Sequence, residues 1–168
     1  NSRFPESVEG QNGIVWAGIG QGDVLVTPLH MAMIAGSVAN GGAMMQPYLV
    51  KKITSADGAT VREGASGVYR QVMREDTANL IAKYMYETVE SGTASRARIS
   101  GYTVCGKTGS AETSDDKTKA TDSWFTGFIY DDDHPYAVAV VVEEGGAGGQ
   151  AATVLGRTAL EYAIQYIG

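Results

Sequence analysis

Apolar side chains recur every three to four positions in one central segment of this chain, and that period is typical of a helix. The segment spans about residues 75–90, and its apolar positions are Leu80, Ile81, Tyr84, Met85 and Val89. Glu75 and Asp76 begin it, where carboxylates favour the positive end of the helix dipole. We therefore expect a helix that packs on the rest of the protein through this stripe.

Two other segments carry helix signals at their ends. Thr27 can cap a helix whose first position is Pro28, and Gly41–Gly42 ends that helix. A last helix is expected at about residues 150–166, after the glycine-rich link GGAGG. Its buried stripe is expected to contain Leu155, Ala159, Tyr162 and Tyr166. Residues 1–24 show neither pattern and are expected to be irregular.

Short runs rich in β-branched and aromatic residues predict strands in the rest of the chain. Three of them, residues 101–110, 123–130 and 136–144, follow one another after the central helix. The turn DDDHP makes the last two an antiparallel hairpin, and Asp57–Gly58 closes another within residues 48–63. The pattern predicts one domain of the α+β class, an antiparallel sheet packed with helices and a C-terminal helix on the sheet.

Composition limits the kinds of partner and cofactor. The 168 residues carry a net charge of −6, which disfavours nucleic acid and anionic membrane surfaces as partners. One cysteine and two histidines cannot form an internal disulfide or a zinc site, so we expect no metal and no cofactor. The longest apolar run, Tyr136 to Val142, has the length of a strand and is far too short to span a membrane.

The segment GYTVCGKTGS, residues 101–110, fits two unrelated motifs. Its first eight letters satisfy the P-loop pattern G-x-x-x-x-G-K-T, and Lys107-Thr108-Gly109 is the third signature of serine β-lactamases and penicillin-binding proteins. A P-loop needs a buried strand before it and a helix after it. The flanking runs SRARIS and SAETSDDKTKATD are too charged and too polar for either, so we reject the P-loop.

As a strand, the segment places Lys107 and Gly109 on one face and Thr108 and Ser110 on the other. The lysine supplies a positive charge, the two hydroxyls can donate to a carboxylate, and Gly109 lets another backbone approach closely. The free amides of an edge strand can also pair with an extended peptide or hold an oxyanion. The alternative is an ordinary edge strand that the lysine protects from aggregation.

Further blocks decide between these interpretations. GIGQGDVLVTPLHMAMIAGSVANGG, QPYLV, ESGTA, GKTGSAE and SWFTGF stand in this order along nearly the whole chain. Together they resemble the C-terminal half of the transpeptidase domain of class B penicillin-binding proteins. The resemblance implies a partial β-lactamase/transpeptidase-like fold. It also implies a D,D-transpeptidase that cross-links peptidoglycan stem peptides through an acyl-serine intermediate and binds β-lactams.

The resemblance also implies roles for the strand residues. Lys107 would provide electrostatic support and take part in a proton network. Thr108 and Ser110 would bind the substrate or antibiotic carboxylate, and Gly109 would be a further substrate-binding residue. The backbone N–H of Ser110 would be one of two oxyanion donors. Ser110 stands where many family members have threonine, and the change keeps the hydroxyl.

The family also needs Ser-x-x-Lys, which carries the nucleophile and its base, and Ser-x-Asn, both before Lys-Thr-Gly. No Ser-x-Asn occurs in the chain, and the one Ser-x-x-Lys, Ser114 to Lys117, follows the strand. Two carboxylates between these residues would raise the pKa of the lysine, the wrong direction for a base. We therefore expect residues 1–168 to be the C-terminal portion of a single transpeptidase domain, without its nucleophile and inactive alone.

Expected partners follow from this assignment. They are stem peptides ending in D-Ala-D-Ala, β-lactams, the N-terminal half of the domain, and a second copy bound through an uncovered sheet edge. The family implies the extracytoplasmic face of a bacterial membrane, with an N-terminal anchor outside these residues. The competing hypotheses are a non-catalytic peptide-binding module and a β-lactam sensor or β-lactamase-related domain. A Ser-x-x-Lys upstream in the parent gene would favour the enzyme over the module.

Several other features have simpler interpretations. Cys105 lies on the lysine face of the strand and is expected to be a buried, unreactive thiol. Arg96 and Arg98 are interpreted as surface charges, and GIGQGD and GGAGG as turns. Trp124 and Phe125 are expected in the core of the sheet.

Overall fold

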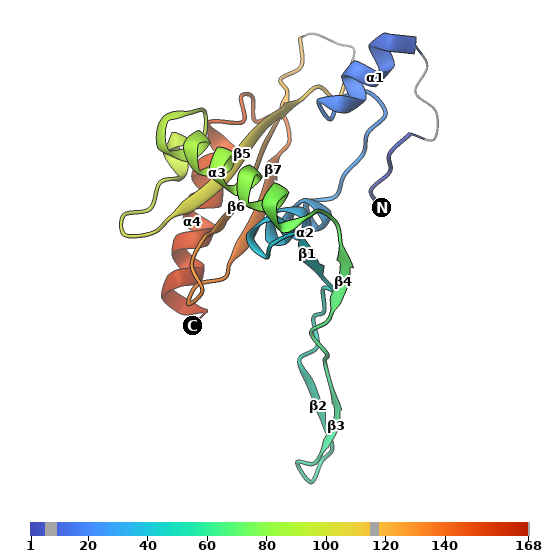
Figure 1. Cartoon of the computed structure of the whole chain (residues 1–168), viewed down its shortest axis with the longest axis vertical. Coiled ribbons are helices and arrows are strands. Elements are labelled where there is room, and N and C mark those ends of the chain that lie inside the picture. The colour runs from blue at the N-terminus through green and yellow to red at the C-terminus, as the bar shows by residue number, and fades with distance from the viewer. Residues whose placement is uncertain (6–9, 115–117, 168) are drawn as a thin grey trace.

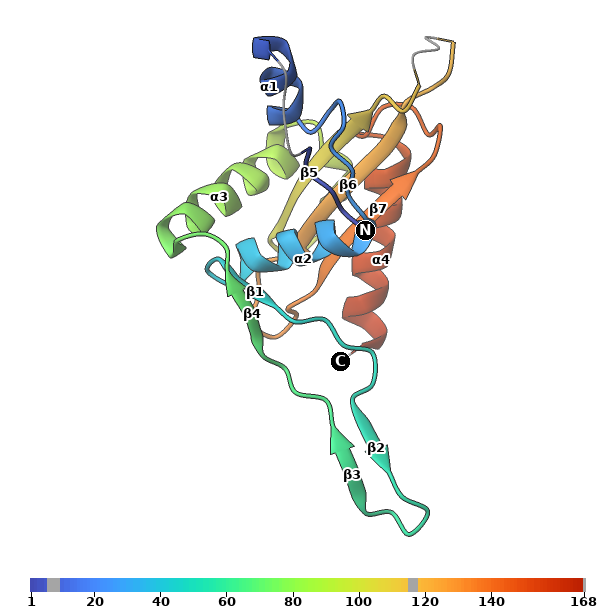
Figure 2. The same ribbon diagram turned by 90° about the vertical axis from the view of Figure 1, so that its right-hand side faces the viewer.

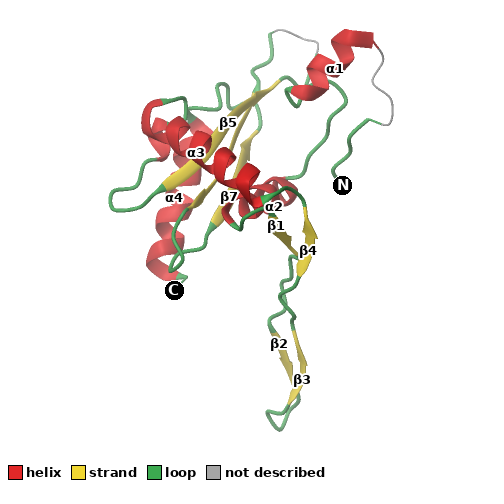
Figure 3. Ribbon diagram, viewed as in Figure 1, coloured by secondary structure: helices red, strands yellow, loops and turns green. Residues whose placement is uncertain are grey.

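A three-stranded antiparallel sheet forms the centre of the computed structural model, which describes residues 1–5, 10–114 and 118–167. Its strands, in spatial order, are β5 (Val104–Ala111), β6 (Asp122–Ile129) and β7 (Ala137–Val142). The other elements are α1 (Gly10–Gly18), α2 (Pro28–Ala39), β1 (Ala43–Met45), β2 (Lys52–Thr54), β3 (Thr60–Glu63), β4 (Val68–Gln71), α3 (Glu75–Ser91), the 3-10 helix η1 (Ser95–Ala97) and α4 (Ala151–Tyr166). Figures 1 and 3 show these elements along the chain.

Helices cover both faces of the sheet (Figure 2). On one face, α4, η1 and the end of α3 enclose a core cluster built on Val104, Phe125 and Ile129. On the other face, α2 and α3 pack against Cys105 and Phe128. The α+β fold and the C-terminal helix on the sheet are thus confirmed, and no helix of the described residues is long and apolar enough to cross a membrane.

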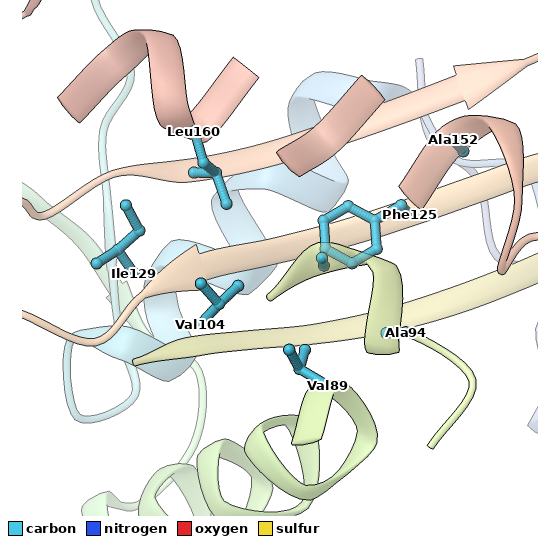
Figure 4. Packing of buried hydrophobic residues seen from close by; sticks show 8 residues of the cluster. Val89, Ala94, Val104, Phe125, Ile129, Ala152 and Leu160 are labelled. Carbon is cyan, nitrogen blue, oxygen red and sulfur yellow. The ribbon is translucent and has the colours of Figure 1, made fainter. Parts of the chain in front are cut away.

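The ring of Phe125 lies in the core between α4 and the sheet (Figure 4). It fills a slot that three glycines leave open. A Cβ added to Gly106, Gly127 or Gly156 would stand 2.6, 2.9 or 2.3 Å from a ring atom. These glycines come from β5, β6 and α4, so a single aromatic side chain holds the helix and two strands together. Phe125 is completely buried, as predicted, whereas Trp124, also expected in the core, is only partly buried.

The start of α2 follows the predicted capping pattern. Thr27 has extended backbone dihedrals, and its hydroxyl accepts a hydrogen bond from the N–H of His30 at 3.2 Å. Pro28 occupies the first turn, where no helical hydrogen bond needs its missing N–H.

The apolar stripe of α3 is only partly the predicted one. Met85 and Val89 are buried, but Leu80 and Tyr84 are 49% and 57% exposed. The residues buried in α3 are Ala78, Ala82, Met85 and Val89. Small alanines let the helix axis approach α2 and the sheet, and Leu80 and Tyr84 are turned towards solvent.

The buried stripe predicted for α4 is wrong. Leu155, Tyr162 and Tyr166 are more than half exposed, and Ala159 is exposed as well. The buried residues of α4 are Ala152, Thr153, Gly156, Leu160 and Ala163. Because Gly156 must face Phe125, the helix is rotated so that its small residues meet the sheet. The apolar period alone could not distinguish the two faces.

Two further expectations about element boundaries need correction. Residues 1–24 are not wholly irregular, because α1 lies within them. The strand predicted from residue 101 begins at Val104, since Gly101 has a φ of +86°, outside the extended region. The pairing of β1 with β4 was not predicted, because the partner strands are separated by the hairpin between them.

The hairpin around Asp57–Gly58 is confirmed and forms an arm directed away from the sheet (Figures 1 and 2). Gly58 has a φ of +87°, which explains the glycine at this turn. Every residue of β2 and β3 is exposed. The arm therefore contributes little to the core of the described chain.

Candidate active site

The outer half of β5 leaves the core and lines a cavity of about 620 Å³. Val104, Cys105 and Gly106 are buried, whereas Lys107 is exposed at the point where the strand reaches the cavity. In the described part of the chain β5 has only β6 as a ladder partner, so its other edge is open. The cavity is lined by Ile19, Gln21, Thr93, Arg96, Lys107, Thr108, Gly109, Ser110, Ala147, Gly148, Gly149 and Gln150.

One continuous strand rules out the P-loop. Residues 104–111 pair with β6 without interruption, from Val104 opposite Ile129 to Ala111 opposite Asp122. A P-loop would require a helix to begin at the Gly-Lys-Thr letters. The rejection of the P-loop is therefore confirmed by the structure.

Thr108 is joined to the segment that follows α3. Its hydroxyl lies 2.8 Å from the hydroxyl of Thr93, close enough for a hydrogen bond in either direction. Thr93 is positioned by the end of the helix, because the N–H groups of Gly92 and Ala94 both donate to the carbonyl of Thr88 at 3.1 Å. The ESGTA block thus belongs to the site and supports one of its hydroxyls.

Ser110 receives hydrogen bonds from two loops. Its Oγ accepts from the N–H of Gly148 at 3.0 Å, and its carbonyl accepts from Nε2 of Gln21 at 3.2 Å. A Cβ on Gly148 would stand 2.1 Å from the carbonyl oxygen of Gly109. A backbone does approach Gly109 closely, and the glycine that this approach requires is Gly148.

Lys107 presents its ammonium at the same edge. Nζ donates to the carbonyl of Thr108 at 2.5 Å, and no ion pair involves Lys107 within the described ranges. The strand therefore brings an ammonium group and two hydroxyls to one cavity. This set of donors suits a carboxylate or another anionic oxygen.

Cys105 shares a strand face with Lys107 but lies two residues deeper. It is 2% exposed and packs with Val38, Met85 and Phe128. Burial raises the pKa of its thiol to about 12, so the group stays protonated at neutral pH. A thiol in this state is a poor nucleophile, and the interpretation of Cys105 as a buried core residue is confirmed.

Several cavity residues were not recognised from the sequence. Arg96 is exposed, as predicted for a surface charge, but its position is on the cavity wall. Gln21 and Gly148 come from the GIGQGD and GGAGG runs that were interpreted as plain turns. GIGQGD was one of the blocks that carried the family resemblance, whereas GGAGG was not. Both runs lie beside the Lys-Thr-Gly strand in space, which their positions in the sequence do not show.

The remaining candidate chemistry lies elsewhere or is untested. His134 contacts Asp131 through Nδ1 at 3.3 Å in the turn between β6 and β7. Lys117 lies outside the described residues, so the Ser114-x-x-Lys117 spacing stays a sequence prediction. Over residues 1–5, 10–114 and 118–167, no group of three or more histidine, cysteine or acidic side chains is placed to hold a metal ion.

Comparison with known proteins identifies the family to which this fold and its Lys-Thr-Gly cavity belong. The family model of the penicillin-binding protein transpeptidase domain matches residues 1–161. The chain belongs to this family. This chain is 33% identical over 153 residues to the peptidoglycan D,D-transpeptidase PbpA of Mycolicibacterium smegmatis. The alignment covers 88% of this chain and 31% of the relative. The chain is 34% identical over 119 residues to penicillin-binding protein 3 of Bacillus subtilis, covering 68% of this chain and 17% of the relative.

Solved structures agree with this assignment. Penicillin-binding protein A from Mycobacterium tuberculosis superposes with a TM-score of 0.87 at 30% identity, over 95% of this chain and 39% of that one. The ceftriaxone acyl-enzyme complex of the same protein superposes with a TM-score of 0.90 at 30% identity, over 98% of this chain and 38% of that one. The chain therefore spans between 17% and 39% of the length of these relatives, and its α+β transpeptidase fold is that of a part of them.

Proposed function

We propose that this chain forms the Lys-Thr-Gly wall of a D,D-transpeptidase active site, which binds the terminal carboxylate of a peptidoglycan stem peptide or of a β-lactam. The observation that carries the proposal is the convergence of the Lys107 ammonium and the Thr108 and Ser110 hydroxyls on one open cavity. Charge-assisted hydrogen bonds to a carboxylate need donors of this kind. The D,D-transpeptidase name of the relatives supports the same chemistry.

The backbone N–H of Ser110 is the proposed oxyanion donor on this wall. The carbonyl of Ser110 accepts from Gln21 at the open edge of β5. In a strand, the N–H and C=O of one residue point to the same side, which supports an N–H of Ser110 that also faces outward. An amide held there can stabilise the negative oxygen that develops when the substrate carbonyl is attacked.

The acyl-transfer step needs a nucleophile from another segment. In that step a serine hydroxyl attacks the penultimate D-Ala carbonyl, its proton passes to a base, and the terminal D-Ala leaves as an amine. The 168 residues contain no Ser-x-Asn and no Ser-x-x-Lys before Lys107. We therefore propose that the chain is the C-terminal portion of a transpeptidase domain whose remaining portion carries the serine, and that alone it forms no acyl-enzyme.

Incubation with benzylpenicillin tests both statements. We expect intact-mass spectrometry to show no covalent adduct, and amide chemical shifts to report reversible binding at β5. Lys107→Gln should weaken this binding roughly tenfold, because it removes one charge-assisted hydrogen bond. Lys83→Gln, which removes the same charge from an exposed position on α3, is the control.

Two results would contradict the proposal. A stoichiometric adduct on Ser110 or Ser114 would show that the nucleophile lies in this chain. Unchanged β5 shifts at millimolar benzylpenicillin would show that this wall does not recognise the carboxylate.

The partners and location of the parent protein are proposed on the same basis. They are stem peptides ending in D-Ala-D-Ala, the remaining part of the domain, and the extracytoplasmic face of a bacterial membrane. A second copy of the chain bound along the edge of β7 is a further proposed partner, because β7 has only β6 as a ladder partner in the described sheet.

A further inference from the structure

The cavity beside β5 contains a second cation that the Lys-Thr-Gly chemistry does not use. Arg96 lines it together with Lys107, and no aspartate or glutamate belongs to the described lining. The whole chain has a net charge of −6, so two cations without a carboxylate between them form a local exception. A cavity lined by one sign of charge favours ligands of the opposite sign.

The backbone that carries Arg96 is held firmly in place. Arg96 is the middle residue of η1, and the alanines on either side, Ala94 and Ala97, are completely buried in the core. The glycine loop closes from the other side, since a Cβ on Gly149 would stand 2.6 Å from the carbonyl of Thr93. The position of the guanidinium is therefore limited mainly by its own side-chain rotamers.

The two neighbouring arginines differ in what they contact. Nε of Arg98 donates to the carbonyl of Ser95 at 3.1 Å, and Arg98 is not part of the cavity lining. Within the ranges that the structure describes, Arg96 makes no ion pair or side-chain hydrogen bond. Its donors are available to a ligand in the cavity.

We propose that Arg96 binds a second carboxylate of the ligand, beyond the terminal carboxylate held by Thr108 and Ser110. The site then favours stem peptides with an acidic side chain near the terminal D-alanines over peptides with a neutral or basic one. A guanidinium offers two parallel N–H donors to one carboxylate, which gives geometric selectivity as well as charge. This inference rests on the proposed function, because Lys107, Thr108 and Ser110 must hold the first carboxylate.

Two penicillins that differ by one carboxylate test the inference. Benzylpenicillin has only the ring carboxylate, and carbenicillin has a second one on the same side chain. Titration of the 168-residue chain, followed by amide shifts, should show carbenicillin binding about threefold to fivefold more tightly, as for one exposed ion pair. This preference should decrease with added salt.

Arg96 variants assign the preference to the side chain. Arg96→Gln should remove the difference between the two penicillins, whereas Arg96→Lys should keep part of that difference. Arg98→Gln, which removes the same charge two residues away, should keep the whole preference and controls for the long-range field.

The outcomes separate this inference from the function on which it rests. Equal binding of the two penicillins, or a preference that survives Arg96→Gln, overturns the second-carboxylate site and leaves the proposed function standing. If neither penicillin shifts the β5 amides, the proposed function fails, and this inference fails with it.

Discussion

Phe125 shows how much of this fold depends on single atoms. Three glycines from three elements meet its ring, and none of those positions has room for a methyl group. Interiors are packed so closely that one added carbon must displace its neighbours. The glycines at 106, 127 and 156 are therefore core residues, although they bury no side chain of their own.

We predict that Gly156→Ala destabilises the protein despite a better helix propensity. Alanine favours a helix over glycine by about 1 kcal/mol, but overpacking a core costs about 1–3 kcal/mol, and the new Cβ would lie 2.3 Å from the Phe125 ring. Urea denaturation should show a net loss of up to about 2 kcal/mol in the free energy of unfolding.

Gly18→Ala is the matched control for that substitution. It adds the same methyl group to α1, where a Cβ would meet nothing within 4 Å. Its free energy of unfolding should be unchanged or slightly higher. If Gly156→Ala were as stable as the unsubstituted chain, the packing of the Phe125 ring would not depend on the missing side chain at residue 156.

Cys105 predicts a pH dependence of stability at alkaline pH. Burial raises the pKa of its thiol from 9.0 to about 12 in the folded protein. Only the unfolded chain ionises the thiol just above pH 9, so the folded state binds more protons there. The stability from this group is complete below pH 9 and is lost as the pH rises towards 12.

The Cys105→Ala variant isolates this effect from the other alkaline groups. Between pH 8 and 10.5, the unsubstituted chain should lose about 1–2 kcal/mol more of its free energy of unfolding than the Cys105→Ala variant does. Urea titrations at the two pH values measure the difference. Parallel losses in the two proteins would contradict the burial of the thiol.

At the scale of elements, the chain separates into a packed sheet and an exposed arm. Most apolar residues of β5 and β6 are buried and most residues of β7 are half-buried, whereas every residue of β2 and β3 is exposed. At the base of the arm, the N–H of Gly64 donates to the carbonyl of Lys51 at 2.8 Å. The hydrogen bond between Lys51 and Gly64 can close a short turn in place of the arm.

We predict that replacing residues 52–63 with Asn-Gly leaves the sheet and the site intact. The two new residues would form a tight turn whose closing hydrogen bond joins Lys51 and Gly64. The free energy of unfolding should change by less than about 1 kcal/mol, because exposed residues contribute little to stability. Circular dichroism during urea denaturation measures the stability of the sheet, and the amide shifts of β5 with benzylpenicillin test whether the site is intact. A larger loss would show that the arm stabilises the core.

At the scale of the whole molecule, the β7 edge of the sheet is open to association. β7 is the apolar run AVAVVV, and its outer edge has no ladder partner among the described strands. Such an edge can pair with another chain. We predict a dimer whose fraction rises with concentration in sedimentation velocity, and a smaller fraction for Val141→Lys, which places a charge on the strand.

The charge control for that dimer is a lysine placed away from the edge. Ala159→Lys lies on the exposed face of α4 and changes the net charge equally. It should leave the dimer fraction close to that of the parent. A protein that stays monomeric at high micromolar concentration would contradict pairing through β7.

The sequence by itself determined the elements whose signals are local. Thr27-Pro28 marks the start of α2, and Asp57–Gly58 marks the hairpin turn. The strand-forming residues around Lys107 mark the strand that lines the site. Capping and turn formation depend on a few adjacent residues, so a single sequence contains enough information. The order of short blocks was also sufficient to indicate the family.

Only the tertiary structure decided which faces are buried and which segments meet. Leu155 and Tyr162 have the spacing of a buried stripe, yet Gly156 faces the core because the Phe125 ring needs its space. Gln21 reaches the Lys-Thr-Gly strand from a distant part of the chain, and Arg96, from the segment just before the strand, lines the same cavity. Helical rotation and long-range contact depend on the shapes of neighbouring elements, and the period of a single segment does not contain that information.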